Sequence, residues 1–401
     1  MAKRKTVLAS AAAPALQVVA PEVLAARKRI GKAYELLADQ PASLARLSQA
    51  DRGDVVVSAV LDDTGNAVVL SRVKDLVWEM WPFVTTPNTA DCQKRLDWSV
   101  IPVDYREACQ NVLYNYWKVG RPGWAVPGVS SIVKTLNCLR IICRFAGKLK
   151  LESLADMGTF HVANFVHEQK KSRLAPSTRR TRFLMVELLY LFRAQHDGAL
   201  QMHPWPDSSA KEMAGITGED TNDMRMVALT PLIPVEVAQR LYRHAKGILD
   251  RADALLDERD RGERSAFRGA EIIGVRDACF YLLGVLTGMR SSELSSIEIG
   301  AGRTEVKNGI TFHWVASVEH KTKKGRVEYL MPSMGHDILR ILERWSQPYR
   351  ERLAVQIAAM ANQEEQLTPE ELQWLATARS NTRMLFLGNG SSGIVPVSGT
   401  R

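Results

Sequence analysis

The chain has 401 residues, of which 46% are hydrophobic and 24% are charged, and its formal net charge is +9 at pH 7. This length allows two or three domains with sizeable cores, and the composition is that of a soluble globular protein. No apolar run reaches the roughly 18 residues of a transmembrane helix, and Pro14 and Gln17 interrupt the Ala-rich start that could otherwise act as a signal peptide. We therefore expect a cytoplasmic protein that does not bind a membrane.

The cysteine pattern argues against disulfides and zinc. The chain has an odd number of cysteines and no Cys-x-x-Cys pair. We predict that they are buried free thiols in a reducing compartment. The positions are Cys92, Cys109, Cys138, Cys143 and Cys279. No metal-ligand cluster and no Gly-rich phosphate loop is found, so we expect no metal and no cofactor.

Residues 1–100 form an N-terminal extension whose fold the sequence does not define. A helix is expected over Pro21–Leu37 and a short strand at Val55–Val57. Large aromatic residues follow, and we predict that they pack against the next domain, because buried aromatic side chains usually belong to a core. They are Trp78, Trp81, Phe83 and Trp98.

Residues 101–206 show the apolar periodicity of a compact helical bundle. Predicted helices cover Tyr105–Tyr116, Ser130–Phe145 and His161–Gln169, and Ser177 or Thr178 caps a fourth. From Tyr105 to Trp205 positive charges exceed negative ones by nine, which equals the net charge of the whole chain. A locally basic domain indicates a polyanionic partner such as nucleic acid.

The basic residues of this bundle gather near its last helix. Lys170 and Lys171 are expected in a loop that leads to Pro176, and three arginines follow at the start of the helix: Arg179, Arg180 and Arg182. Positive charge at a helix N-terminus is mildly unfavourable to the fold. This conflict favours a role in DNA binding over the alternative of a solvated face.

A polar, aperiodic linker is expected over residues 207–227, and a second domain over residues 228–401. Its first helix should cover Val235–Leu256, followed by a charged loop or frayed helix over Asp257–Arg268. An apolar helix then starts near Arg276.

This apolar helix runs into a corner around Arg290. Gly288 should end the helix, because glycine adopts positive φ without a Cβ clash. A new helix should begin near Glu293, capped by one of the two serines that precede it. Arg290 and Glu293, three residues apart, could then form a phosphate-binding pair or an ordinary solvated ion pair.

Two strands follow, over Ile310–Val318 and Val327–Met331, joined by a basic hairpin tip. The tip carries the cations Lys321, Lys323, Lys324 and Arg326. Without further context it could be a solvated turn.

Two more helices are predicted, Gly335–Met360 and Thr368–Ala378, the second with a capping box from Thr368 to Glu371. Leu385–Leu387 should be a short strand, and the remaining Gly/Ser-rich residues a tail. His336 lies four residues before Arg340, and we interpret this pair as the start of an amphipathic helix.

The segment Thr287-Gly288-Met289-Arg290-Ser291-Ser292-Glu293-Leu294 resembles the first arginine box of the tyrosine recombinase, or phage integrase, family. The start of the last bundle helix loosely resembles the core-binding domain of the same family. The resemblance implies a mainly α fold with a small β component: a helical core-binding bundle followed by an incomplete α+β catalytic domain.

The resemblance also implies a function in site-specific DNA recombination or integration by a mobile element. Arg290 would stabilise the charge on the scissile phosphate, Glu293 would orient Arg290, and Lys321 would act as general acid. DNA contacts would come from Lys170, Lys171, Arg179, Arg180, Arg182, Lys323, Lys324 and Arg326. Double-stranded DNA would be the partner, and the complete protein would act as a homo-oligomer, a tetramer on paired sites.

The His-x-x-Arg box and the nucleophilic tyrosine of the family do not follow the Leu385–Leu387 segment. The resemblance covers about Val103–Phe386, and we expect the chain to stop inside the catalytic domain and to be inactive alone. The alternative is a non-catalytic DNA-binding protein derived from a recombinase. A type IB topoisomerase shares the chemistry, but the bundle and its loop lengths favour an integrase.

Overall fold

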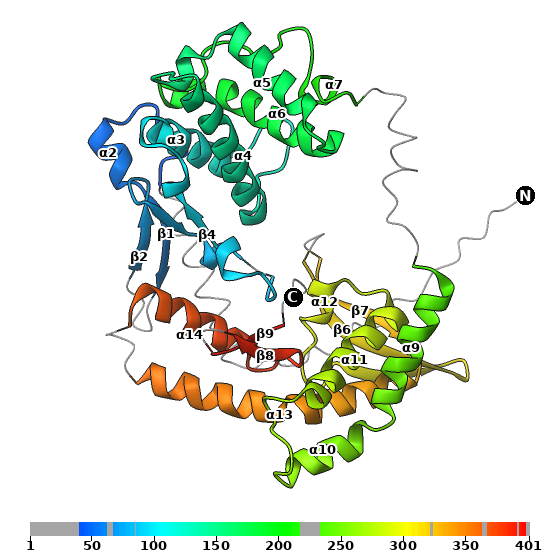
Figure 1. The fold of residues 1–401 in the computed structure, drawn as a ribbon. Coiled ribbons are helices and arrows are strands. Elements are labelled where there is room, and N and C mark those ends of the chain that lie inside the picture. Colours follow the sequence, from blue (N-terminus) through cyan, green and yellow to red (C-terminus); the bar gives the residue numbers. More distant parts are fainter. Residues whose placement is uncertain are drawn as a thin grey trace, which may run out of the picture.

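The computed structural model describes residues 40–61, 67–84, 86–216, 233–320, 324–362, 367–390 and 393–397. These residues are mainly α-helical with small antiparallel sheets, which confirms the predicted fold class at that level. They form two hydrophobic cores, one built by residues between 44 and 216 and the other by residues between 245 and 394. We call the two parts the N-terminal half (40–216) and the C-terminal half (233–397), and Figure 1 shows both.

The N-terminal half begins with short elements and continues as a helical bundle (Figure 1). The short elements are α2 (Gln49–Asp54), β1 (Val56–Leu61), β2 (Ala67–Arg72), β3 (Val77–Glu79) and β4 (Arg95–Asp97), where β1 pairs with β2 and β3 with β4. The bundle helices are α3 (Val103–Val119), α4 (Val129–Lys148), α5 (Thr159–Lys171), α6 (Pro176–Leu191) and the short α7 (Ala210–Met213). The four helices predicted for this bundle are thereby confirmed.

Aromatic side chains of the residues before α3 pack into the bundle core, as predicted. Trp78 and Trp98 are fully buried, and their ring centroids lie 4.8 Å apart in an edge-to-face arrangement. The ring of Phe83 meets that of Trp117 on α3 at 5.0 Å. Residues from the expected N-terminal extension and from the bundle therefore share one hydrophobic core.

Two boundaries in the basic region differ from the prediction. Lys170 and Lys171 belong to the last turn of α5 instead of a loop. Helix α6 begins at Pro176 with Ala175 as its N-cap, so the predicted serine or threonine cap is wrong. Proline is suited to the first helical position because its fixed φ is helical and its missing N–H would have no partner there.

Part of the predicted linker is folded. Residues 207–216 include α7, and Ala210, Ala214 and Ile216 are buried in the core of the N-terminal half. The sequence shows no periodicity here because one short helical turn is too brief to reveal any. Residues 217–232 lie outside the described residues.

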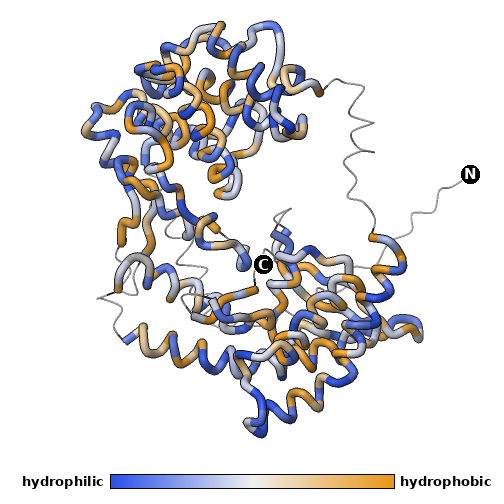
Figure 2. The backbone as a smooth tube through the Cα atoms, in the orientation of Figure 1, coloured by the Kyte–Doolittle hydropathy of each residue, from blue (hydrophilic) through white to orange (hydrophobic). Residues whose placement is uncertain are grey.

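The C-terminal half contains six helices and five strands in its described residues. Its helices are α9 (Val235–Leu249), α10 (Ala252–Asp260), α11 (Ala270–Thr287), α12 (Ser291–Leu294), α13 (Met334–Ala361) and α14 (Pro369–Asn381). Its strands are β5 (Gly302–Lys307), β6 (Ile310–Glu319), β7 (Gly325–Met331), β8 (Leu387–Gly390) and β9 (Gly393–Pro396). Figure 2 shows hydrophobic and hydrophilic residues interleaved along the helices of both halves, as expected for helices with one buried face.

The single helix predicted over Val235–Leu256 is broken in two. α9 ends at Leu249 and α10 begins at Ala252, and all three of Leu249, Ala252 and Leu255 are buried. The change of direction lets α9 pack on α11 while α10 also packs on α13. An apolar period cannot reveal such a break, because each part satisfies the helical pattern by itself.

The two predicted strands are confirmed as β6 and β7, in a three-stranded sheet of order β5-β6-β7. Strand β5 was missed, because half of its residues are charged, most are exposed, and they show no apolar alternation. One face of the sheet packs on the core through Val315 and Met331, and α13 crosses close to β5 and β6. This packing fixes the hairpin β6–β7 relative to α11 and α12.

The residues after α13 follow the prediction in part. The capping box is confirmed: the Thr368 hydroxyl accepts the Glu371 N–H, and the Glu371 carboxylate accepts the Thr368 N–H at 2.8 Å. Leu385 and Phe386 are fully buried, but the strand itself begins at Leu387. In place of the predicted tail, β8 and β9 form an antiparallel hairpin.

Two further predictions concern the cysteines and the membrane. The cysteines are free thiols, and four of the five are buried, whereas Cys92 is exposed. Among the described helices, none combines the length and the apolar character needed to cross a bilayer.

Candidate functional site

The corner between α11 and α12 has the predicted helix stop. Gly288 is left-handed, with φ 69° and ψ 14°, and its N–H donates to the Gly284 carbonyl at 2.9 Å. A residue with a side chain would be strained in this conformation, which is why glycine is common at helix ends. The chain then turns sharply and starts α12 three residues later.

The cap of α12 differs from the prediction. Its N-cap is Arg290 itself, in an extended conformation, and neither serine has this role. The Arg290 N–H donates to Glu293 Oε2 at 2.7 Å. The carboxylate thus accepts the backbone N–H of the N-cap residue, as in one half of a capping box. The same glutamate therefore holds both the backbone and, as described next, the side chain of Arg290.

The Arg290 guanidinium lies between two carboxylates. Its Nη1 atom donates to Glu293 Oε1 at 2.6 Å and to Glu319 Oε1 at 3.2 Å. The arginine side chain is 50% exposed, whereas those of Glu293 and Glu319 are 1% and 11% exposed. Among the described residues, no protein group accepts a hydrogen bond from its Nε or Nη2 atoms. One edge of a fixed cation is thus left for an anionic ligand.

The charges of this cluster are set by its surroundings. Burial raises the pKa of Glu293, but the Arg290 amide, the Arg290 guanidinium and the Tyr329 hydroxyl outweigh it, so the net pKa is lowered. Burial, together with the nearby Glu293 carboxylate, raises the pKa of Tyr329 to about 12. Near neutral pH, Glu293 is therefore ionised and Tyr329 is a neutral hydrogen-bond donor.

His320 follows Glu319 at the end of β6 and contacts the chain just after α12. One of its ring nitrogens, Nε2, lies 2.8 Å from the Ser296 hydroxyl. Burial lowers the pKa of His320, and Glu293 opposes this shift only in part. A second link lies nearby, where the Ser317 hydroxyl donates to the Glu293 carbonyl at 2.5 Å.

The hairpin places one further cation, Lys324, beside a carboxylate that holds Arg290. Glu319 is paired with Gly325 across the strands, and Lys324 Nζ lies 3.9 Å from Glu319 Oε2. Lys324 and Arg326 are both exposed. The predicted Lys321 and Lys323 lie outside the described residues.

The basic residues of the bundle lie where α5 ends and α6 begins. Arg182 Nη1 donates to the Gln169 side chain at 2.5 Å, which holds the last turn of α5 against α6. This contact brings the exposed Lys170 and Lys171 close to the arginines of α6. Within the arginine cluster Arg180 is exposed, whereas Arg179 and Arg182 are partly buried. The candidate DNA contacts of this half therefore form one local group.

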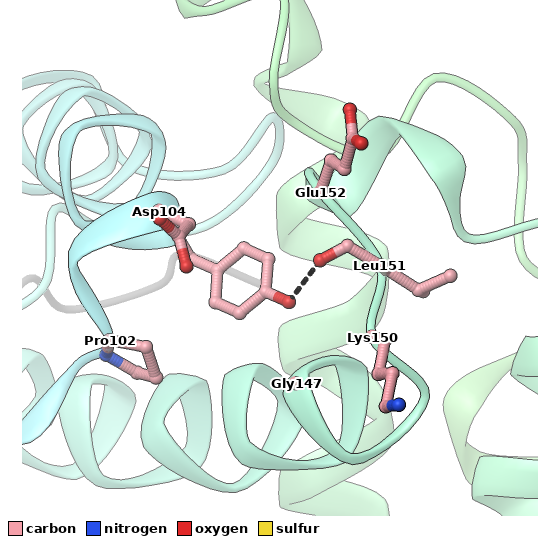
Figure 3. Close-up of a pocket in the computed structure, with 7 residues that line it drawn as sticks. Pro102, Asp104, Gly147, Lys150, Leu151 and Glu152 are labelled. Atoms are coloured by element: carbon pink, nitrogen blue, oxygen red, sulfur yellow. Dashed lines mark hydrogen bonds between the residues drawn. The ribbon is translucent and has the colours of Figure 1, made fainter.

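A shallow pocket in the N-terminal half, with a volume of about 390 Å³, offers a different surface (Figure 3). Its Tyr105 hydroxyl donates to the Leu151 carbonyl at 2.5 Å. The charged residues of its lining are Asp104, Lys150 and Glu152. This pocket shares no residue with the Arg290 corner.

Sequence reasoning missed three groups of the corner: Glu319, His320 and Tyr329. A signal existed for Glu319, because it shares the core-facing side of β6 with Val315 and Ser317, where a charged residue is unusual. Tyr329 pairs with Val315 in the register, which the sequence does not reveal.

Comparisons with known proteins find distant matches among solved structures. No protein-family model matches the sequence, and no curated protein matches it. The matching solved structures include the crystal structure of the XerH site-specific recombinase bound to palindromic difH substrate, in a post-cleavage complex. Its TM-score is 0.32 and its sequence identity is 13%. The alignment covers 60% of this chain and 56% of that chain, so the match spans little more than half of either protein.

Proposed function

We propose that this chain binds double-stranded DNA and holds its scissile phosphate, as part of a site-specific recombinase of the tyrosine type. The observation that carries the proposal is the state of Arg290. Two carboxylates fix its Nη1 atom, and its Nε and Nη2 edge has no partner among the described residues. Such an edge matches two phosphate oxygens in a bidentate contact.

In the proposed reaction a tyrosine attacks the phosphate, and a 3′-phosphotyrosyl link forms before the strand passes to a 5′-hydroxyl of a partner duplex. Arg290 stabilises the charge that develops on the phosphate oxygens. Glu293 and Glu319 act as positioning residues, because a guanidinium that is already fixed needs little rearrangement to meet the transition state. Lys321 donates a proton to the leaving 5′-oxygen. No metal or nucleotide is required.

DNA binding itself is proposed to be mostly electrostatic. The basic group at the junction of α5 and α6 and the hairpin cations Lys323, Lys324 and Arg326 would contact phosphates along the duplex. The basic excess of the bundle supports this proposal, because counterion release from DNA is the main source of such affinity. A homo-tetramer on paired sites is part of the same proposal.

A second candidate function is DNA binding without cleavage. The observation that favours it is the pairing of one guanidinium with two carboxylates, which leaves the isolated trio with a net negative charge. A phosphate approaching Arg290 would meet repulsion from Glu293 and Glu319 unless nearby cations such as Lys324 compensate. The two candidates differ in whether the corner contacts a phosphate at all.

The test is a coupling experiment between Arg290 and single phosphates. A duplex selected for tight binding would be made with one neutral methylphosphonate at each backbone position in turn. Affinities of the unaltered protein and of Arg290→Ala would be measured by fluorescence anisotropy. The matched control is Arg303→Ala, which removes an exposed arginine of the same half that is paired with Glu305 and Glu328.

If the proposal is right, the Arg290→Ala and methylphosphonate effects fail to add at one phosphate, with a coupling of about tenfold in Kd, because both changes remove the same charge-assisted bond. Arg303→Ala should show additive effects at that position. Additivity at every phosphate for Arg290→Ala would overturn the proposal and leave binding without phosphate capture.

A further inference from the structure

A second cluster lies on the sheet face that α13 approaches, apart from the Arg290 corner. It joins Thr304 of β5, His313 of β6 and His336 in the first turn of α13. His336 Nε2 lies 3.1 Å from His313 Nδ1, and the Thr304 hydroxyl lies 3.2 Å from His336 Nε2 and 3.5 Å from His313 Nδ1. Two imidazole nitrogens and one oxygen therefore form a small triangle.

The dimensions of this triangle fit a metal ion. In a tetrahedral site with bonds of about 2.0–2.1 Å, neighbouring ligand atoms lie about 3.3 Å apart, and the three sides here bracket that value. We propose that His313, His336 and Thr304 bind a divalent transition-metal ion of the zinc, nickel and copper type. Imidazole favours these metals, whereas magnesium and calcium prefer oxygen ligands.

The fold holds the ligands in place by three independent elements. Thr304 and His313 are direct partners in the register of β5 and β6, so their side chains share one face. His336 reaches them from α13, and Gly302 leaves room for its ring, because a Cβ there would lie 3.1 Å from His336 Nδ1. Both histidines are partly buried, which limits the rotamers that they can adopt.

The ligand set also determines the strength of binding. Among the described residues, no group of three or more His, Cys, Asp or Glu side chains gathers around one point. Water must therefore complete the coordination, and the hydroxyl is a weak third ligand. We expect affinity on the order of micromolar, far weaker than that of structural zinc sites with four protein ligands. A bound ion would fasten α13 to the edge of the sheet.

The test is metal titration of the full chain without a polyhistidine tag. All proteins would carry Cys92→Ser, because this exposed thiol could bind the same metals. Zinc chloride binding would be followed by calorimetry, and copper(II) chloride binding by electron paramagnetic resonance. The variants are His313→Gln, His336→Gln and Thr304→Val, and the control is His244→Gln, an exposed histidine on α9.

We expect one zinc ion per chain, with unchanged binding in His244→Gln. Each histidine variant should bind at least about tenfold more weakly, since even outer-shell changes cost 10–100-fold. The copper spectrum should show coupling to two protein nitrogens, reduced to one in either histidine variant. Absence of stoichiometric binding, or unchanged affinity in any of the three variants, would overturn the proposed site. Circular dichroism would identify a variant that fails to fold. In that case the copper spectrum of the unaltered chain decides: coupling to two protein nitrogens supports the site, and its absence overturns it.

Discussion

Replacement of Glu293 by glutamine should destabilise the C-terminal half. The Glu293 side chain is 1% exposed, and its two oxygens accept the Arg290 N–H at 2.7 Å and Arg290 Nη1 at 2.6 Å. A glutamine of the same shape offers one oxygen and one NH2 group. One of the Arg290 donors would then face another donor in place of a carboxylate oxygen.

The magnitude follows from that single mismatch. Leaving one buried donor unsatisfied costs about 1–3 kcal/mol, and removal of a helix cap falls in the same range. For a unit of 150–250 residues each kcal/mol lowers Tm by about 2–4 °C, so a fall of about 2–12 °C is expected. Little is added by the Arg290 ion pair, because the half-exposed guanidinium is well screened by water.

Thermal unfolding at pH 7, followed by circular dichroism, measures this effect. The matched control is Glu319→Gln, whose carboxylate forms ion pairs with the exposed cations Arg290 and Lys324, at 3.2 and 3.9 Å. It should cost less than about 1 kcal/mol. Equal Tm values for Glu293→Gln and the unaltered protein would refute the role of Glu293 as the cap of α12.

Three further predictions concern pH, DNA binding and chemistry. The pKa of Glu293 is lowered from its ordinary value of 4.5, so its stabilising effect should be complete above pH 4.5 and should disappear as pH falls through the lower value. Urea unfolding at several pH values should show that the free energies of unfolding of the unaltered protein and of Glu293→Gln converge below about pH 4.5. Replacing the three arginines of α6 by alanine should weaken DNA binding and flatten its salt dependence. The slope of the log binding constant against log salt concentration should fall by about 0.9 for each phosphate that the variant no longer neutralises. An unchanged slope would show that these residues do not contact the DNA. In any form of the protein that makes a covalent adduct with a nicked suicide duplex, Arg290→Lys should lower adduct formation by about 10²–10³-fold. The reason is that a lysine ammonium cannot replace the two parallel hydrogen bonds of a guanidinium. A near-normal amount of adduct on a denaturing gel would contradict the proposed role.

Elements governed by local rules could be predicted from the sequence. The bundle helices follow from apolar periodicity, the end of α11 from Gly288, and the start of α14 from the Thr368–Glu371 capping box. The β6–β7 hairpin follows from its β-branched and aromatic residues. In each case the signal and the structure that it specifies lie within a few residues of each other. The pairing of Arg290 with Glu293 belongs to the same group, since three residues on a helical turn separate them.

What the sequence could not supply is the set of groups that meet from distant positions. Glu319 reaches Arg290 across 29 residues, and His336 reaches His313 across 23. These pairings depend on strand register and on how α13 packs over the sheet, which many weak apolar contacts decide together. The sequence by itself therefore determined the bundle helices, the turn after α11 and the arginine with its glutamate. Only the tertiary structure decided which carboxylate closes the corner and which histidines meet, because packing of the whole half brings these residues together and no local pattern encodes it.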